Sequence, residues 1–130
     1  MARSGSLRIG DSEEAAALFA TTFRHEGVEE LRIAHLDSDR RLIALCTHGG
    51  GSVGRLELPL QEIAREALVL QSHGILMAHN HPSGDSTPSR SDIIATRELA
   101  EVAERLNIRL YDHLIFAPNS WTSLLALGLL

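Results

Sequence analysis

The most informative segment of this chain is ILMAHNHPSGDSTPSRSD, residues 75–92. It begins with four apolar residues, 75–78, which predict a central strand covered on both faces of a sheet. His79 and His81 follow directly, and because side chains alternate along a strand they share one face, about 6.6 Å apart along the backbone. Two imidazoles at that spacing can bind one metal ion. The end of a strand is also where α/β sheets commonly carry their sites.

Asp92 is the candidate third ligand. A helix is expected over about residues 89–106, and Asp92 falls on its core-facing stripe. The other residues of that stripe are Ala95, Leu99, Val102, Ala103 and Leu106. A buried carboxylate is costly without a charge partner, and a divalent cation beside two histidines supplies one. Three protein ligands leave a fourth tetrahedral position for water, as in catalytic zinc sites.

The competing interpretation of this segment is purely structural. Ser89 and Asp92 form an S-x-x-D pattern, which is typical of a capping box at the start of a helix. Capping does not require two histidines on one strand face just upstream, so the combination favours a metal site.

Length and composition predict one globular domain. The chain has 130 residues, of which 44% are hydrophobic and 22% are charged. Its single cysteine excludes an intramolecular disulfide framework and a Cys-rich zinc site. A net charge of −5, with one Trp, one Tyr and three Phe, gives no strong signal for nucleic-acid binding. The N-terminal MARSGS lacks the apolar segment of a signal peptide, and no apolar run could span a bilayer, so no membrane partner is expected. With a single cysteine, the reducing cytoplasm is the expected compartment.

Hydrophobic periodicity predicts helices that alternate with strands. The helices are expected at about residues 11–26, 59–72 and 89–106, and the strands at about 29–36, 41–47, 55–58, 75–78 and 108–116, before a closing segment at 121–130. The glycine run at 49–51 lacks the G-K-[ST] ending of a phosphate loop. This alternation predicts a layered α/β or α+β domain built on a mixed sheet.

A metal hydrolase usually needs a general base near its water. Residues 79–92 contain no glutamate, so the base must come from elsewhere. The candidates include Glu29, Glu30, Glu57 and Glu62. Glu29 shares strand parity with Leu31 and Ile33, which directs it toward a buried face, whereas Glu30 would point away.

The isolated histidines and the cysteine receive structural interpretations. These histidines are His25, His35, His48 and His73. None has ligand spacing to another histidine, so each is expected to be structural or solvated. Cys46 shares strand parity with Leu42 and Ala44 and is expected to pack as a small hydrophobic residue.

The motif residues resemble a known metalloprotease pattern. His79, His81, Pro82, Ser89 and Asp92 read H-x-H-P-x6-S-x-x-D, which resembles the JAMM (MPN+) motif. The longer HNHPSGDSTPSRSD, the later D-H at 112–113 and the ending WTS…GLL resemble more closely the RadC-like JAB domain family. The resemblance implies a short N-terminal extension at 1–10 and one JAB/MPN domain at 11–130. The implied fold is a cytidine-deaminase-like α/β/α sandwich with a central mixed sheet.

The resemblance also implies a role for each residue of the motif. His79, His81 and Asp92 would bind Zn²⁺, and Ser89 would donate a hydrogen bond to the developing oxyanion of the substrate. Glu29, which lies eight residues before an L-D turn, would be the general base. The implied activity is a zinc-dependent hydrolysis of amide or isopeptide bonds, in the manner of a JAMM-type metallopeptidase, on a peptide or protein substrate.

Several alternatives remain beside this interpretation. Glu30 replaces Glu29 if the strand register slips by one, and Asp112 and His113 would act behind the ligands or structurally. A non-catalytic or DNA-repair-associated domain could keep the same metal. Full-length relatives carry an N-terminal helical region with helix-hairpin-helix character, and its absence here weakens a DNA role for this chain. A zinc deaminase needs H-x-E and P-C-x-x-C, which Cys46 alone cannot supply, and an HNH nuclease spreads its motif over a ββα unit.

Overall fold

Helices and strands alternate along the chain, of which this computed structural model describes residues 7–23, 28–49 and 57–130. The elements are α1 (Ser12–Ala20), β1 (Glu30–Leu36), β2 (Leu42–Gly49), α2 (Leu60–Val69), β3 (Gly74–Asn80), α3 (Arg90–Arg105), β4 (Arg109–Ala117) and β5 (Ser120–Ser123). Asp11 caps α1 by accepting a hydrogen bond from the Glu14 backbone N–H at 2.8 Å, and Ser89 caps α3, as expected for short oxygen-bearing side chains at helix starts.

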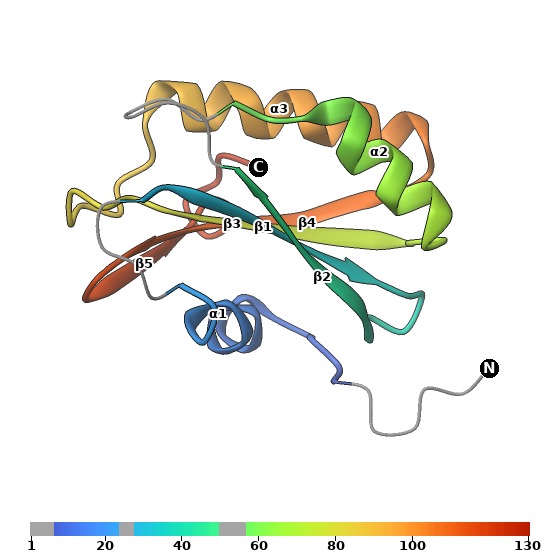
Figure 1. Cartoon of the computed structure of the whole chain (residues 1–130), viewed down its shortest axis with the longest axis horizontal. Helices are drawn as coiled ribbons and strands as arrows, with labels where there is room; N and C mark the ends of the chain where they lie inside the picture. The colour runs from blue at the N-terminus through green and yellow to red at the C-terminus, as the bar shows by residue number, and fades with distance from the viewer. Residues whose placement is uncertain (1–6, 24–27, 50–56) are drawn as a thin grey trace.

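The strands form one mixed sheet in the order β2-β1-β3-β4-β5. The β3–β4 pair is parallel, and the other three pairs are antiparallel. Helices α2 and α3 cover one face of the sheet and α1 covers the other (Figure 1). The predicted α/β/α sandwich with a central mixed sheet is therefore confirmed.

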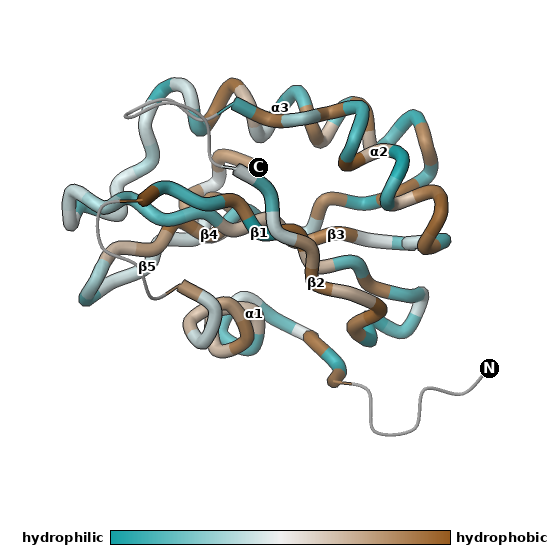
Figure 2. Tube along the Cα trace, in the orientation of Figure 1, coloured by the Kyte–Doolittle hydropathy of each residue, from teal (hydrophilic) through white to brown (hydrophobic). Residues whose placement is uncertain are grey.

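Each face of the sheet carries its own apolar core. The α2/α3 side contains Leu31, Ile33, Ile63, Ala67, Ile75, Met77, Ala95, Leu99, Ala103, Ile108 and Leu110. The α1 side contains Ile9, Ala15, Ala16, Phe19, Ala34, Leu36, Leu76, Ala78, Leu114 and Phe116. Strands and helices alike mix hydrophobic and hydrophilic positions along the chain (Figure 2). Because β3 is central, all seven of its residues are buried, as its continuous apolar run predicts.

Several predicted boundaries differ from the structure. Helix α1 ends at Ala20. Residues 24–26 of the longer predicted helix, which include His25, lie outside the described residues. Residues 57 and 58 form no strand, and the rest of the predicted strand at 55–58 lies outside the described residues, as do residues 50–52 of the glycine loop. Among the described helices, none is long and apolar enough to cross a membrane.

A β-bulge in β4 determines which way the next residues face. Ile75 of β3 pairs with Leu110, but Leu76 pairs with Asp112, so Tyr111 is an extra residue in β4. A bulge reverses the alternation of side chains beyond it. Asp112 therefore faces α1, and His113 faces α3.

Candidate metal centre

His79, His81 and Asp92 converge on the α3 side of the sheet. His79 lies near the end of β3, and His81 directly follows that strand. The capping box holds Asp92 in the first turn of α3. The two carboxylate oxygens divide between the rings: His79 Nε2 lies 3.2 Å from Oδ1, and His81 Nε2 lies 3.1 Å from Oδ2. One ligand atom from each of the three residues lies within 4.8 Å of the others. His79 and Asp92 are each 1% exposed.

A chain of hydrogen bonds behind His79 fixes which ring nitrogen carries its proton. Thr96 Oγ1 donates to the backbone carbonyl of Asp92 at 2.6 Å, which uses the only hydroxyl proton. His113 Nδ1, 2.6 Å from the same oxygen, must therefore be the donor of that pair. Burial is the largest effect on the pKa of His113 and lowers it well below its ordinary value, so the His113 ring is neutral and its Nε2 is an acceptor.

The neutral His113 ring sets the tautomer of His79. His79 Nδ1 lies 2.8 Å from His113 Nε2, and because Nε2 of His113 carries no proton, His79 Nδ1–H donates. In the neutral His79 ring, Nε2 then carries the lone pair, directed at Asp92. A second hydrogen bond of this kind is what usually orients a metal-binding histidine.

His81 is oriented in the same way by the backbone. Its Nδ1 lies 2.8 Å from the carbonyl oxygen of Asp85, which can only accept, so Nδ1 carries a proton and Nε2 faces Asp92. The hydrogen bond with Asp92 outweighs burial and raises the pKa of His81. Burial alone would raise the pKa of Asp92, but the neighbouring His79 and His81 rings hold it well below its usual range. The carboxylate is therefore ionised and can bind a cation.

The three residues fit a zinc ion. Zn–N and Zn–O bonds of about 2.0–2.2 Å place tetrahedral ligand atoms about 3.3 Å apart, close to the 3.1 and 3.2 Å contacts here. Buried His79 Nε2 makes no hydrogen bond with any part of the chain that the structure describes. An orphaned lone pair beside an ionised carboxylate is what a divalent cation would satisfy.

Comparison with known proteins identifies the family. The model of the RadC-like JAB domain matches residues 9–129. This chain belongs to the RadC-like JAB domain family. Over 110 residues it is 38% identical to a UPF0758 protein of Ruegeria pomeroyi, an alignment that covers 85% of this chain and 49% of that protein. A UPF0758 protein of Roseiflexus castenholzii is 35% identical over 123 residues, 95% of this chain and 53% of the relative. The chain thus spans about half the length of these curated relatives.

Ser89 of this RadC-like JAB domain caps helix α3, and its hydroxyl proton stays available for the predicted contact with substrate. Its Oγ accepts a hydrogen bond from the Asp92 backbone N–H at 3.0 Å, and its own N–H donates to Asp92 Oδ2 at 2.8 Å. The capping box expected from the sequence is therefore present. Because the hydroxyl accepts in that bond, its proton is available for the Ser91 hydroxyl, 3.1 Å away, or for a substrate. The catalytic role of Ser89 stays a prediction.

The two candidate general bases, Glu29 and Glu30, differ in their surroundings. Glu30 Oε1 pairs with Arg32 at 2.9 Å, on the α1 side of β1. Leu31 pairs with His79 across the β1–β3 register, and extending that antiparallel register by two residues brings half-buried Glu29 opposite His81. The charge of Glu29 contributes to the raised pKa of His81, after the larger effects of Asp92, burial and Asp85. Glu29 as general base stays a prediction.

Sequence reasoning did not assign Asp112, His113 or Thr96 to particular contacts. Asp112 accepts hydrogen bonds from the hydroxyls of Ser12 and Ser123, both at 2.6 Å. It also accepts from the backbone N–H of His113 at 2.7 Å and of Leu125 at 3.0 Å. It thereby ties α1 and the segment after β5 to β4. The only signal in the sequence was the D-H pair, whose two residues face opposite sides of the sheet.

The structure gives two of the remaining histidines specific contacts and corrects the predicted strand parity of Cys46 with Leu42. His35 is wholly buried, and both it and His48 contact the carboxylate of Glu66 on α2. Cys46 pairs with Ile33 on this side of the sheet, whereas Leu42 packs on the α1 side. The reason is a β-bulge in β2: His35 pairs with Ala44 but Leu36 pairs with Leu42, so the parity of Leu42 does not extend to Cys46.

Proposed function

We propose that this RadC-like JAB domain is a zinc-dependent hydrolase of amide or isopeptide bonds. The observation that carries the proposal is the convergence of His79, His81 and Asp92 with both Nε2 atoms directed at one carboxylate. These residues would hold the zinc ion. When bound, zinc supplies a Lewis acid that polarises a carbonyl and lowers the pKa of a water molecule.

The protein's own residues supply the remaining chemistry of the proposal. His113 and the Asp85 carbonyl hold the two imidazoles as Nδ1–H tautomers, so that both Nε2 atoms are presented. Glu29 takes a proton from the attacking water and delivers it to the leaving amine. The Ser89 hydroxyl donates to the oxyanion that develops on the substrate carbonyl, a contact that strengthens as negative charge accumulates.

Metal content tests the ligand assignment. We expect the Asp92→Ala variant to lose one equivalent of zinc per chain relative to wild type, while Asp39→Ala, at an exposed turn, keeps the wild-type content. Both would be measured by elemental analysis after dialysis, with circular dichroism to establish folding. Equal zinc content in wild type and folded Asp92→Ala would refute the site.

Hydrolysis tests the base independently of the metal. We expect Glu29→Gln to retain its zinc and to lose about 10²–10⁴-fold in hydrolysis of a peptide or isopeptide panel, the usual contribution of a general base. Glu30→Gln is the matched control, because its carboxylate pairs with Arg32. Undiminished hydrolysis by Glu29→Gln would exclude Glu29 as the base.

If wild type binds zinc but cleaves no member of the panel, the non-catalytic metal-binding alternative is favoured.

A further inference from the structure

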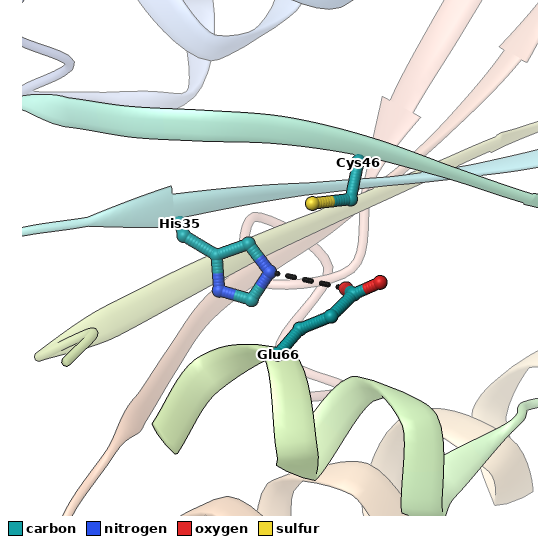
Figure 3. A group of neighbouring side chains, drawn as sticks. All are labelled: His35, Cys46 and Glu66. Carbon is teal, nitrogen blue, oxygen red and sulfur yellow. Dashed lines mark hydrogen bonds and ion pairs between the residues drawn. The ribbon is translucent and has the colours of Figure 1, made fainter. Parts of the chain in front are cut away.

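A second group of metal-ligand side chains lies on the same face of the sheet, between β1, β2 and α2. His35 of β1, Cys46 of β2 and Glu66 of α2 point toward one another (Figure 3). One ligand atom from each lies within 4.8 Å of the other two. Imidazole, thiolate and carboxylate are the three ligand types that zinc takes from proteins.

His35 is held as a metal-binding histidine is held. The side chain is 0% exposed, and its Nδ1 lies 2.8 Å from the Ser72 hydroxyl. With Nδ1–H donating to the Ser72 oxygen, this bond directs the unprotonated Nε2 at Glu66. The hydrogen bond that orients a metal-bound imidazole is normally made at the other ring nitrogen in this way.

The spacing between His35 and Glu66 is long for a hydrogen bond. Nε2 and Oε1 are 3.4 Å apart, whereas charge-assisted N–H···O bonds are about 2.7–2.9 Å. Neighbouring ligand atoms on a zinc tetrahedron are about 3.3 Å apart, given Zn–N and Zn–O bonds of about 2.0–2.2 Å. The observed separation fits two ligands of one ion better than a direct bond.

Glu66 is itself positioned by a second histidine. His48 Nε2 lies 3.2 Å from the same Oε1, and His48 Nδ1 lies 3.2 Å from Glu62. His48 is buried on the sheet, whereas Glu62 is exposed on α2. These contacts fix the direction of the Glu66 carboxylate toward His35 and Cys46.

We propose that His35 Nε2, Cys46 Sγ and the Glu66 carboxylate form a second transition-metal site, suited to Zn²⁺, with His48 positioning Glu66. The ligand set is distinct from His79, His81 and Asp92, so this site does not depend on the hydrolase proposal. Three ligands from two strands and a helix would also link α2 to the sheet.

Metal binding at this site requires loss of the thiol proton. Burial first, and the charge of Glu66 next, raise the pKa of Cys46, so the sulfur is a thiol in the metal-free protein. When the ion binds, the S–H bond breaks, the proton leaves to solvent and the sulfur electron pair forms the bond to the metal. Affinity at this site therefore increases with pH.

Cobalt(II) substitution tests the proposal, because Cys46 is the only cysteine in the chain. We expect the reduced, chelator-treated wild-type protein to develop a near-ultraviolet thiolate-to-cobalt charge-transfer band when titrated with Co²⁺. The Asp92→Asn variant should keep this band, since the other centre contains no sulfur. Absence of the band in folded wild type at saturating Co²⁺ would overturn the proposal without any variant.

Variants then assign the ligands. Cys46→Ser should abolish the band, and Glu66→Gln should weaken Co²⁺ affinity at this site by more than the roughly 10–100-fold that loss of a residue behind a ligand costs. Exposed His73→Ala should change nothing. A charge-transfer band that survives Cys46→Ser would overturn the assignment. So would cobalt binding, measured in the Asp92→Asn protein, that is lost on adding Glu62→Gln but is unaffected by Cys46→Ser. That second result would place the ion between His48 and the two glutamates.

Discussion

Replacing His113 with leucine should weaken zinc binding at the candidate centre, although His113 lies behind the ligands. The variant removes the acceptor of the His79 Nδ1–H, now 2.8 Å away, and the donor to Thr96. His79 would then have no partner that fixes its tautomer and ring orientation. His113→Gln is the conservative comparison, since its side-chain carbonyl can still accept from His79.

The magnitude follows from the burial of these atoms. Loss of a hydrogen-bonding partner behind a metal-bound histidine typically costs 10–100-fold in metal affinity, or about 1.4–2.7 kcal/mol. The metal-free protein should also lose about 1–3 kcal/mol of unfolding free energy, because the His79 N–H is left unsatisfied in a site that is 1% exposed. His113→Gln should recover most of the affinity.

The assay is a competition for zinc against a chromophoric chelator, in a Cys46→Ser background that removes the sulfur of the second cluster. Chemical denaturation of the chelated variants measures stability, and exposed His73→Leu serves as the matched control. Two results would refute the reasoning: a His113→Leu protein that is folded and binds zinc within threefold of its parent, or equal losses in His113→Leu and His113→Gln.

Three further predictions concern β4 and its pairing with β3. Because the pKa of folded His113 is lowered, the unfolded chain takes up a proton below about pH 6.5 that the folded chain does not. The metal-free protein should therefore lose up to about 1.4 kcal/mol of unfolding free energy per pH unit of acidification. Denaturation at about pH 6.5 and 5.5 measures this loss, which the His113→Gln variant should not show. Asp112→Asn should lower the unfolding free energy by about 1–3 kcal/mol, because an amide NH₂ would face donors, whereas exposed Asp39→Asn should have almost no effect in the same denaturation experiment. Gly74→Ala should cost about 1–3 kcal/mol in thermal or chemical unfolding, because its Cβ would overlap the ring of Tyr111 at the bulge; unchanged stability would mean that the ring moves freely.

The sequence was sufficient for the layers of the fold and for bringing His79, His81 and Asp92 together. Those predictions depended on regular periods: an apolar run for a buried strand, i and i+2 for one strand face, and a 3.6-residue stripe for a helix. The three ligands lie within four residues of the end of β3 or the start of α3, and periodicity locates both of these elements well. Where the strands and helices are regular, their periodicity therefore predicts which side chains come together.

Irregular registers account for much of what the sequence did not predict. Counting alternate residues from Leu110 directs Asp112 toward α3 and His113 away from it, but the extra residue Tyr111 exchanges the two. In β2 the extra residue Ile43 places Leu42 and Ala44 on opposite faces, so Cys46 faces Glu66. A one-residue insertion reverses every side chain beyond it, and nothing in the local composition marks either position.

The two candidate metal clusters share a sheet face yet remain separate. His48, Leu31 and His79 are aligned across neighbouring strands β2, β1 and β3, so two strand spacings, about 10 Å, separate the histidines. Buried Leu31 stands between them and contributes to the core beneath α2 and α3. At that separation, and with no partner shared among the described residues, the energetic effects of substitutions are expected to add. A loss of metal at one cluster can thus be measured without loss at the other, which is why sulfur-specific cobalt absorption and the Asp92 variants report on different parts of one small domain.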